Sequence, residues 1–164
     1  FMKHSFIYTF LALASFTFLA CEKDDICTQE DPTTPGIVLE FYDINNPTEA
    51  KIAPGVLAYV QGSNLAIQAE GNKIILPLQV GQTQTTWQVT LNAQDQDATN
   101  DITDEIILNY AVNHQYVSKA CGYRAVFNLE EANPVSNTNN WITNLTLQNS
   151  IISSQNETHI KIYF

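Results

Sequence analysis

The stretch Thr86-Trp87-Gln88-Val89-Thr90-Leu91-Asn92 has the cleanest two-residue periodicity in the chain. Its apolar members Trp87, Val89 and Leu91 alternate with polar side chains. Successive side chains of a strand point to opposite faces of a sheet, so this stretch predicts a strand with one buried face.

Comparable stretches lie on both sides of it and are separated by turn-forming residues. Gly62-Ser63 and Gly71-Asn72 have turn chemistry, and Pro77 places its strand-like run at a sheet edge or introduces a bulge there. Nowhere do apolar residues recur at helical spacing. We expect an all-β domain, most simply an antiparallel two-sheet β-sandwich of about eight strands. The strand-like stretches are residues 37–44, 55–61, 64–69, 73–80, 86–92, 106–112, 116–128, 141–147 and 159–164.

The start of the chain has the three-part layout of a secretory signal. Lys3 and His4 form a short basic start, residues 6–19 form an uncharged apolar run, and Ala20-Cys21 closes it. A membrane-spanning helix is the weaker interpretation, because such a helix needs about 20 apolar residues. We expect residues 1–20 to be a lipoprotein signal peptide, residues 21–36 an acidic tether, and residues 37–164 the β-sandwich domain.

The end of this signal, Thr17-Phe18-Leu19-Ala20-Cys21, resembles the bacterial lipobox, with Phe18 at the position that is most often leucine. The resemblance implies that the Cys21 thiol is diacylated before cleavage and that the new amino terminus is then acylated. Buried acyl chains contribute about 0.8 kcal/mol per methylene, so the anchor would hold firmly. The alternative is an ordinary signal peptide cleaved nearby, with Cys21 an incidental thiol.

The next residues, Glu22-Lys23-Asp24-Asp25, resemble the acidic signals that send Bacteroidetes lipoproteins to the outer face of the outer membrane. The alternative is a solvated acidic tether without a sorting role. We therefore expect a protein that is lipid-anchored in the outer membrane, and exposed at the cell surface if the motif acts as an export signal.

The charge of the mature chain excludes one class of partner. Lys3 is the only charged residue of the signal, which leaves six basic against 17 acidic side chains and a net charge of −11. Binding to a phosphate backbone needs clustered lysine and arginine, and Arg124 is the single arginine. Nucleic acid is excluded as a partner.

Two cysteines remain once Cys21 carries lipid. An even pair in an oxidising, exported compartment is typically bridged, so we expect a disulfide between Cys27 and Cys121. The bridge would leave only a few free residues between the lipid and the fold. The alternative is two unrelated thiols. A catalytic cysteine is disfavoured, because no nearby histidine would activate a thiolate.

The best candidate metal site is an acidic stretch that we expect to form a loop. Calcium prefers several carboxylate and carbonyl oxygens from a short segment. The register does not match an EF-hand, because Asn100 occupies the glycine position and Ile106 the twelfth position. Solvated acids of a hairpin are the simpler explanation. The acidic residues are Asp95, Asp97, Asp101, Asp104 and Glu105.

The sequence does not indicate an enzyme or a cofactor. The adjacent pairs Glu130-Glu131 and Asp104-Glu105 would point to opposite faces of a strand, which does not suit an acid and base that face one cleft. Hydrolase, zinc-protease and phosphate-loop motifs are absent from the sequence. His114 and His159 are isolated, and we interpret them as structural or surface residues.

Aromatic side chains are the remaining candidates for ligand contact. Exposed aromatic rings can stack on a sugar or a peptide, although most aromatics of a β-sandwich lie in its core. Trp87, within its alternating stretch, is expected in the core. Trp141 follows the polar residues 137–140 and is the candidate binding residue whose exposure should be tested.

Several segments together resemble an uncharacterised family of Bacteroidetes envelope lipoproteins, known only as a domain of unknown function. They are the lipobox cysteine, Asp24-Asp25-Ile26-Cys27, Pro32-Thr33-Thr34-Pro35, Phe41-Tyr42-Asp43, Tyr110, and Val117-Ser118-Lys119-Ala120-Cys121-Gly122-Tyr123-Arg124. The resemblance implies a lipoprotein with a Cys27–Cys121 pair, and it implies no activity.

The sequence thus predicts a non-catalytic, lipid-anchored envelope protein that binds another envelope component or an external ligand. A carbohydrate-binding accessory module of a glycan-uptake system is the alternative, and a coplanar row of exposed aromatic rings would favour it.

Overall fold

The computed structural model describes residues 26–60, 62–63, 65–95 and 97–164. These residues form two compact units. The larger unit contains residues 33–115 and 124–164, and the described part of the smaller unit contains residues 26–32 and 116–123. The predicted signal peptide and Cys21 lie outside the described residues.

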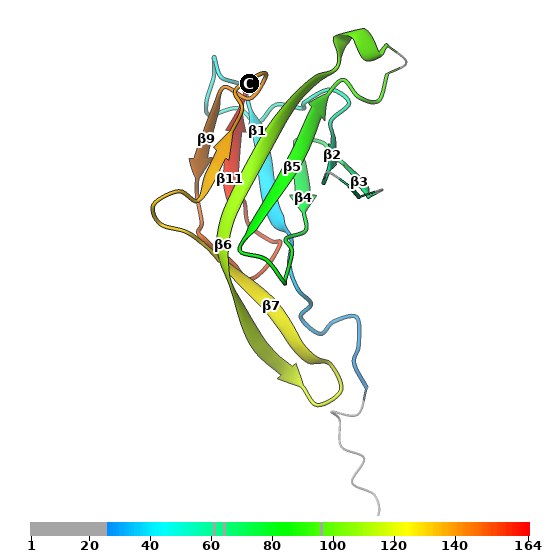
Figure 1. Ribbon diagram of the computed structural model, residues 1–164, viewed down its shortest axis with the longest axis vertical. Coiled ribbons are helices and arrows are strands. Elements are labelled where there is room, and N and C mark those ends of the chain that lie inside the picture. Colours follow the sequence, from blue (N-terminus) through cyan, green and yellow to red (C-terminus); the bar gives the residue numbers. More distant parts are fainter. Residues whose placement is uncertain (1–25, 61, 64, 96) are drawn as a thin grey trace, which may run out of the picture. The chain divides into compact units, whose positions relative to one another are not determined.

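The larger unit contains a four-stranded sheet in the order β4-β1-β11-β9 (Figure 1). Its strands are β1 (Ile37–Tyr42), β4 (Lys73–Leu76), β9 (Asn144–Leu147) and β11 (Ile160–Tyr163). β1 pairs with β4 and β11 pairs with β9 in antiparallel fashion, whereas β1 and β11 are parallel. The all-β fold with two sheets is confirmed, but this sheet is mixed rather than purely antiparallel.

The second sheet has seven strands in the order β10-β7-β6-β5-β2-β3, with β8 also paired to β6. β5 and β6 form its longest pair, in which Trp87 lies opposite Ile106 and Val89 opposite Asp104. The strands are β2 (Leu57–Tyr59), β3 (Ala66–Gln68), β5 (Gln84–Leu91), β6 (Ile102–Ser118), β7 (Gly122–Leu129), β8 (Val135–Asn137) and β10 (Ile151–Ile152).

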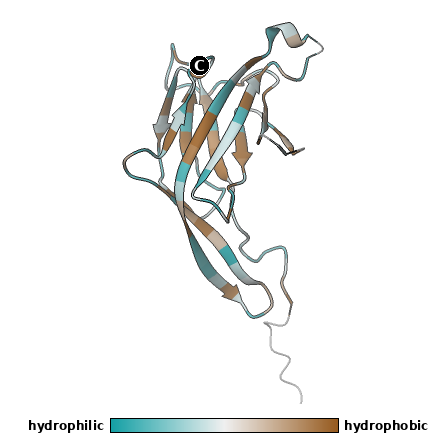
Figure 2. Cartoon of the chain, in the orientation of Figure 1, coloured by the Kyte–Doolittle hydropathy of each residue, from teal (hydrophilic) through white to brown (hydrophobic). Residues whose placement is uncertain are grey.

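The inner faces of the two sheets form one apolar core. Alternation places Trp87 and Val89 of β5 in this core, as the sequence predicts, and it does the same for Ile160 and Ile162 of β11. Figure 2 shows that apolar bands lie on the strands and that the loops are mostly hydrophilic. The largest fully buried side chains include Trp87, Tyr110, Phe41, Phe127, Ile37, Leu39, Ile74, Leu76, Ile106 and Leu108.

The expected strand over residues 73–80 ends before Pro77, and the prediction that it lies at a sheet edge is confirmed. The strand stops at Leu76, and β4 is the outermost strand of its sheet, where a missing backbone donor is tolerated. The Pro77 carbonyl accepts a hydrogen bond from Trp87 Nε1 at 3.3 Å.

Several sequence-based boundaries are wrong, and two of them concern candidate site residues. The expected strand over residues 116–128 is interrupted by a turn at residues 119–121, where β6 ends and β7 begins. The acidic segment is a loop only as far as Asp101, because β6 begins at Ile102 and contains both Asp104 and Glu105. The number of strands exceeds the expected eight mainly because the short strands β8 and β10 were not predicted from the sequence.

Among the described residues, no helix combines the length and the apolar character required to cross a bilayer.

Candidate functional site

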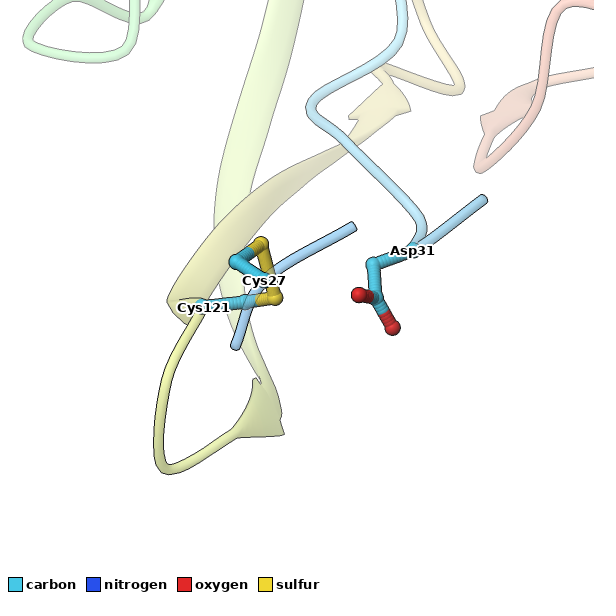
Figure 3. A group of neighbouring side chains, drawn as sticks. All are labelled: Cys27, Asp31 and Cys121. Carbon is cyan, nitrogen blue, oxygen red and sulfur yellow. A yellow bond between two sulfur atoms is a disulfide. The ribbon is translucent and has the colours of Figure 1, made fainter. Parts of the chain in front are cut away.

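A disulfide joins the amino-terminal segment to the turn between β6 and β7. Cys27 and Cys121 are bonded with a Cα–Cα distance of 5.0 Å, and they are 94 residues apart in the sequence (Figure 3). The predicted pairing is therefore present. It attaches the segment that follows the predicted lipid site to the end of a hairpin.

Asp31 lies beside this disulfide and organises the segment that follows Cys27. Its Oδ2 accepts hydrogen bonds from Thr28 N at 2.7 Å and from Thr28 Oγ1 at 3.0 Å, and these bonds lower the pKa of the Asp31 carboxyl. Cys27, Asp31 and Cys121 are close enough to hold a metal ion together. The sulfurs are bonded to each other, so the thiolates that a metal would bind are not available.

The end of the β6–β7 hairpin carries two exposed tyrosines. Tyr116 and Tyr123 are 57% and 69% exposed, and their rings meet edge to face with centroids 5.4 Å apart and planes inclined at 68°. The intervening turn is closed by a hydrogen bond from Cys121 N to Ser118 Oγ at 3.1 Å. Gly122 has φ +70°, a conformation that suits glycine after a three-residue hairpin loop. We call the exposed surface formed by Ile26, Tyr116, Lys119 and Tyr123 the hairpin tip.

Asp104 is the most unusual polar residue of the larger unit, because it occupies the core-facing side of β6 and is fully buried. Its carboxylate accepts hydrogen bonds from the backbone N–H groups of Asn140, Trp141 and Ile142 at 2.7 to 3.1 Å. A fourth donor is Thr138 Oγ1 at 2.7 Å. Burial alone would raise the pKa of this carboxyl, but the hydrogen bonds outweigh burial and lower it. With its oxygens occupied in this way, Asp104 organises a loop and is not arranged as a general acid or base.

Trp141, the candidate binding residue, is buried. Its side chain is only 8% exposed and packs against Phe41 and Phe164, with ring centroids 6.1 and 5.6 Å away. Its Nε1 donates to the Val89 carbonyl at 3.0 Å. Asp104 holds the backbone of the Trp141 loop against β6, which turns the indole into the core and prevents it from stacking on a ligand.

His159 replaces part of the backbone ladder between β1 and β11. Its backbone N–H donates to the Val38 carbonyl, and its Nδ1 accepts from Val38 N, both at 3.0 Å. Because Nδ1 is the acceptor, the neutral ring carries its proton on Nε2, which is buried and has no hydrogen-bond partner among the described residues. Burial lowers the pKa of His159, and Glu157 partly opposes this effect. The interpretation of His159 as a structural histidine agrees with this geometry.

Residues 56–164 match the model of a family of unknown function, DUF6452. The chain belongs to the DUF6452 family. No curated protein and no solved structure matches it. The matched part of this DUF6452 protein includes Asp104, Cys121, Trp141 and His159, but it begins after β1 and Cys27.

The acidic loop of the DUF6452 protein uses its carboxylates locally. Asp95 accepts hydrogen bonds from Asp97 N at 2.8 Å and from Asn100 Nδ2 at 2.9 Å. Asp97 accepts from the backbone and the hydroxyl of Thr99 and so caps a short 3₁₀ turn, Ala98–Asn100. Within the described part of the chain, the candidate calcium ligands Asp95, Asp97 and Asp101 do not come together as a group of three.

The DUF6452 protein also has a groove of about 360 Å³ between the last strands of its two sheets. Edge strands such as β3 and β4 present unpaired backbone groups to which an extended peptide can add as a further strand. The groove is lined by Ile67, Gln68, Glu70, Lys73, Ile74 and Ile75.

Proposed function

We propose that this DUF6452 protein is a non-catalytic module held on the outer membrane by lipid on Cys21. The Cys27–Cys121 disulfide carries the proposal. Structural disulfides form and persist in oxidising, exported compartments. This one lies six residues beyond the cysteine of the lipobox-like sequence. A signal layout, a lipidation sequence and an exported type of cross-link therefore support the same location.

The arrangement of the buried polar groups supports a non-catalytic role. Asp104 and His159 bind backbone groups, as described above. Thr90 Oγ1 lies 2.8 Å from Thr103 Oγ1 across β5 and β6. Thr85 Oγ1 lies 2.6 Å from the Tyr110 hydroxyl, which also exchanges hydrogen bonds with the backbone of Gln79. Each buried polar side chain thus contributes to the fold through its own hydrogen bonds, and we assign the binding role to the surface.

Two surfaces are available for that role: the groove between β3 and β4, and the hairpin tip. The groove suits an extended segment of another envelope protein, because both strands beside it end their sheets. Nothing favours a carbohydrate-binding platform among the described residues, since Trp87 and Trp141 are buried and the rings of Tyr116 and Tyr123 are steeply inclined.

Metabolic labelling tests the anchor. The full chain, produced in a Bacteroidetes host and grown with a clickable palmitate, should carry label and should accumulate as an uncleaved precursor when globomycin is added. Cys21→Ser should lose the label and leave the membrane fraction. The double variant Cys27→Ser/Cys121→Ser is the matched control and should keep the label. Label that persists in Cys21→Ser would remove the lipoprotein assignment.

Protease treatment of intact cells tests the leaflet. If Glu22-Lys23-Asp24-Asp25 acts as an export signal, external protease should degrade the wild-type protein. The variant Asp24→Ala/Asp25→Ala should be protected while it stays acylated. If external protease degrades both proteins to the same extent, the acidic segment is a tether without a sorting role.

A further inference from the structure

Three of the exposed large apolar side chains, Ile26, Tyr116 and Tyr123, belong to the hairpin tip. Ile26 is 75% exposed and adjoins Cys27, and the two tyrosines flank Cys121. No other aromatic side chain among the described residues is as exposed as Tyr116 or Tyr123. Lys119 is also exposed and lies between them on the turn. The tip thus combines apolar area, two amphipathic rings and one cation around the turn between β6 and β7.

Such a combination suits the boundary between lipid and water. Tyrosine has an apolar ring and a polar hydroxyl, and it is enriched at the level of the lipid headgroups. A lysine in the same place keeps its ammonium among the phosphates while its methylenes cover apolar surface. The edge-to-face packing of Tyr116 on Tyr123 holds the two rings in one arrangement, so little side-chain entropy remains to be lost on docking.

The disulfide limits how far this surface can lie from the anchor. Cys27 follows Cys21 by six residues, and a fully extended chain of that length spans about 20 Å. The bond to Cys121 applies the same limit to the turn of the hairpin. With acyl chains on Cys21, the tip is held within reach of the bilayer that contains them.

We propose that the hairpin tip rests in the headgroup layer of the membrane that holds the lipid anchor. The partner is an electroneutral lipid surface, because the acids on both sides of Ile26 and Cys27 in the chain outnumber the basic Lys23 and Lys119 and would be repelled by anionic lipid. These acids are Glu22, Asp24, Asp25, Glu30 and Asp31. The inference rests on the proposed lipidation of Cys21 and adds a second, non-covalent contact to it.

A tryptophan placed at the tip reports this contact. The native Trp87 and Trp141 are buried and supply a constant background. Tyr123→Trp adds an exposed indole and preserves an aromatic ring beside Tyr116. The acylated full-length variant is reconstituted into phosphatidylcholine and phosphatidylethanolamine vesicles, with or without bromine on the acyl chains. The added fluorescence should fall at least twofold in the brominated vesicles.

Three comparisons make the result specific. Ile52→Trp, at a residue that is 70% exposed, is the matched control and should show no bromine quenching. Equal quenching at both positions would overturn the assignment to the tip.

Adding phosphatidylglycerol to the vesicles should not strengthen the quenching of Tyr123→Trp. Stronger quenching would overturn the proposal that the partner is an electroneutral lipid surface. Combining Cys27→Ser/Cys121→Ser with Tyr123→Trp removes the disulfide and should weaken the quenching by bromine. Undiminished quenching would show that the disulfide is not needed to hold the tip at the membrane.

Mass analysis of the Cys21 peptide and flotation with the vesicles separate the two proposals. A protein without acyl chains that fails to float contradicts the proposed function. An acylated protein that floats, but whose Tyr123→Trp fluorescence is the same with and without bromine, contradicts only the docking of the tip.

Discussion

Asp104 shows how one residue can determine the conformation of a distant loop. Its buried carboxylate accepts hydrogen bonds from residues more than thirty positions later in the chain. The donors are Thr138, Asn140, Trp141 and Ile142. A buried charge is tolerated only when its hydrogen-bonding capacity is met, and here three backbone N–H groups and a hydroxyl meet it. Local periodicity places Asp104 on the core face of β6 but does not reveal these donors. The burial of Trp141 was therefore not predictable from its neighbours in sequence.

Replacing Asp104 with asparagine should lower the free energy of unfolding by about 3 kcal/mol, because the amide offers one acceptor oxygen and points an NH₂ group at backbone donors. Urea unfolding at pH 7 measures this change. Asp101→Asn, at an exposed position, should stay within about 0.5 kcal/mol of wild type. The pKa of Asp104 is lowered in the fold, so its stabilising effect is complete above the unfolded pKa of about 4 and is lost as pH falls below it. A loss for Asp104→Asn no larger than that for Asp101→Asn would contradict this role.

His159 should make the stability of the domain depend on pH in the mildly acidic range. Burial lowers its pKa in the fold, so below about pH 6.5 the unfolded chain binds more protons than the folded one. The stabilising effect is complete above pH 6.5 and declines as pH falls toward the folded pKa. Protonation also removes the Nδ1 acceptor from Val38 N.

The measurement is the free energy of unfolding at pH 8 and at pH 5.5. Wild type should lose stability between the two values, and His159→Gln should lose less. His114→Gln changes an exposed histidine and should retain the wild-type pH dependence. If both variants lose as much stability as wild type between pH 8 and pH 5.5, the pH dependence arises from groups other than His159.

At the scale of the elements, strands with long alternation are predictable, whereas the short strands β8 and β10 are not. β1, β5, β11 and the first half of β6 direct alternate side chains into one core, and that pattern is visible over several residues. β8 and β10 are too short to show a period. The turn at residues 119–121 was missed because the alternation of Cys121, Tyr123, Ala125 and Phe127 continues across it. The parallel pairing of β1 with β11 has no local signal, because no tight turn connects the two strands.

β1 should be required for folding although the family match begins after it. It lies between β4 and β11, and Ile37, Leu39 and Phe41 are fully buried. The fragment of residues 56–164 should therefore lack a cooperative thermal transition and should bind the dye ANS. The fragment of residues 33–164 with Cys121→Ser keeps β1 and should melt cooperatively. A sharp transition in the shorter fragment would show that β1 is dispensable.

On the scale of the whole molecule, two long-range links close the chain. The disulfide joins residues 94 apart, and the loop it closes corresponds to about 4 to 5 kcal/mol of stabilisation when only the entropy of the unfolded chain is considered. The second link is the β1–β11 ladder, in which Val38 and His159 are 121 residues apart. The cysteine count and the compartment expected from the signal-like start of the chain make the first link predictable. The second depends on the complete arrangement of the sheet.

The β1–β11 ladder also determines the order in which the protein can assemble. Contacts between residues so distant in sequence cost chain entropy before they return any energy, so folds rich in them reach the native state in milliseconds to seconds rather than microseconds. The adjacent strands β5 and β6 can pair early, and β1 can pair with β4, whereas the other edge of β1 stays unpaired until Ile160–Tyr163 arrives. The core around Ile37, Leu39 and Phe41 is therefore completed only when the last strand of the domain has been added.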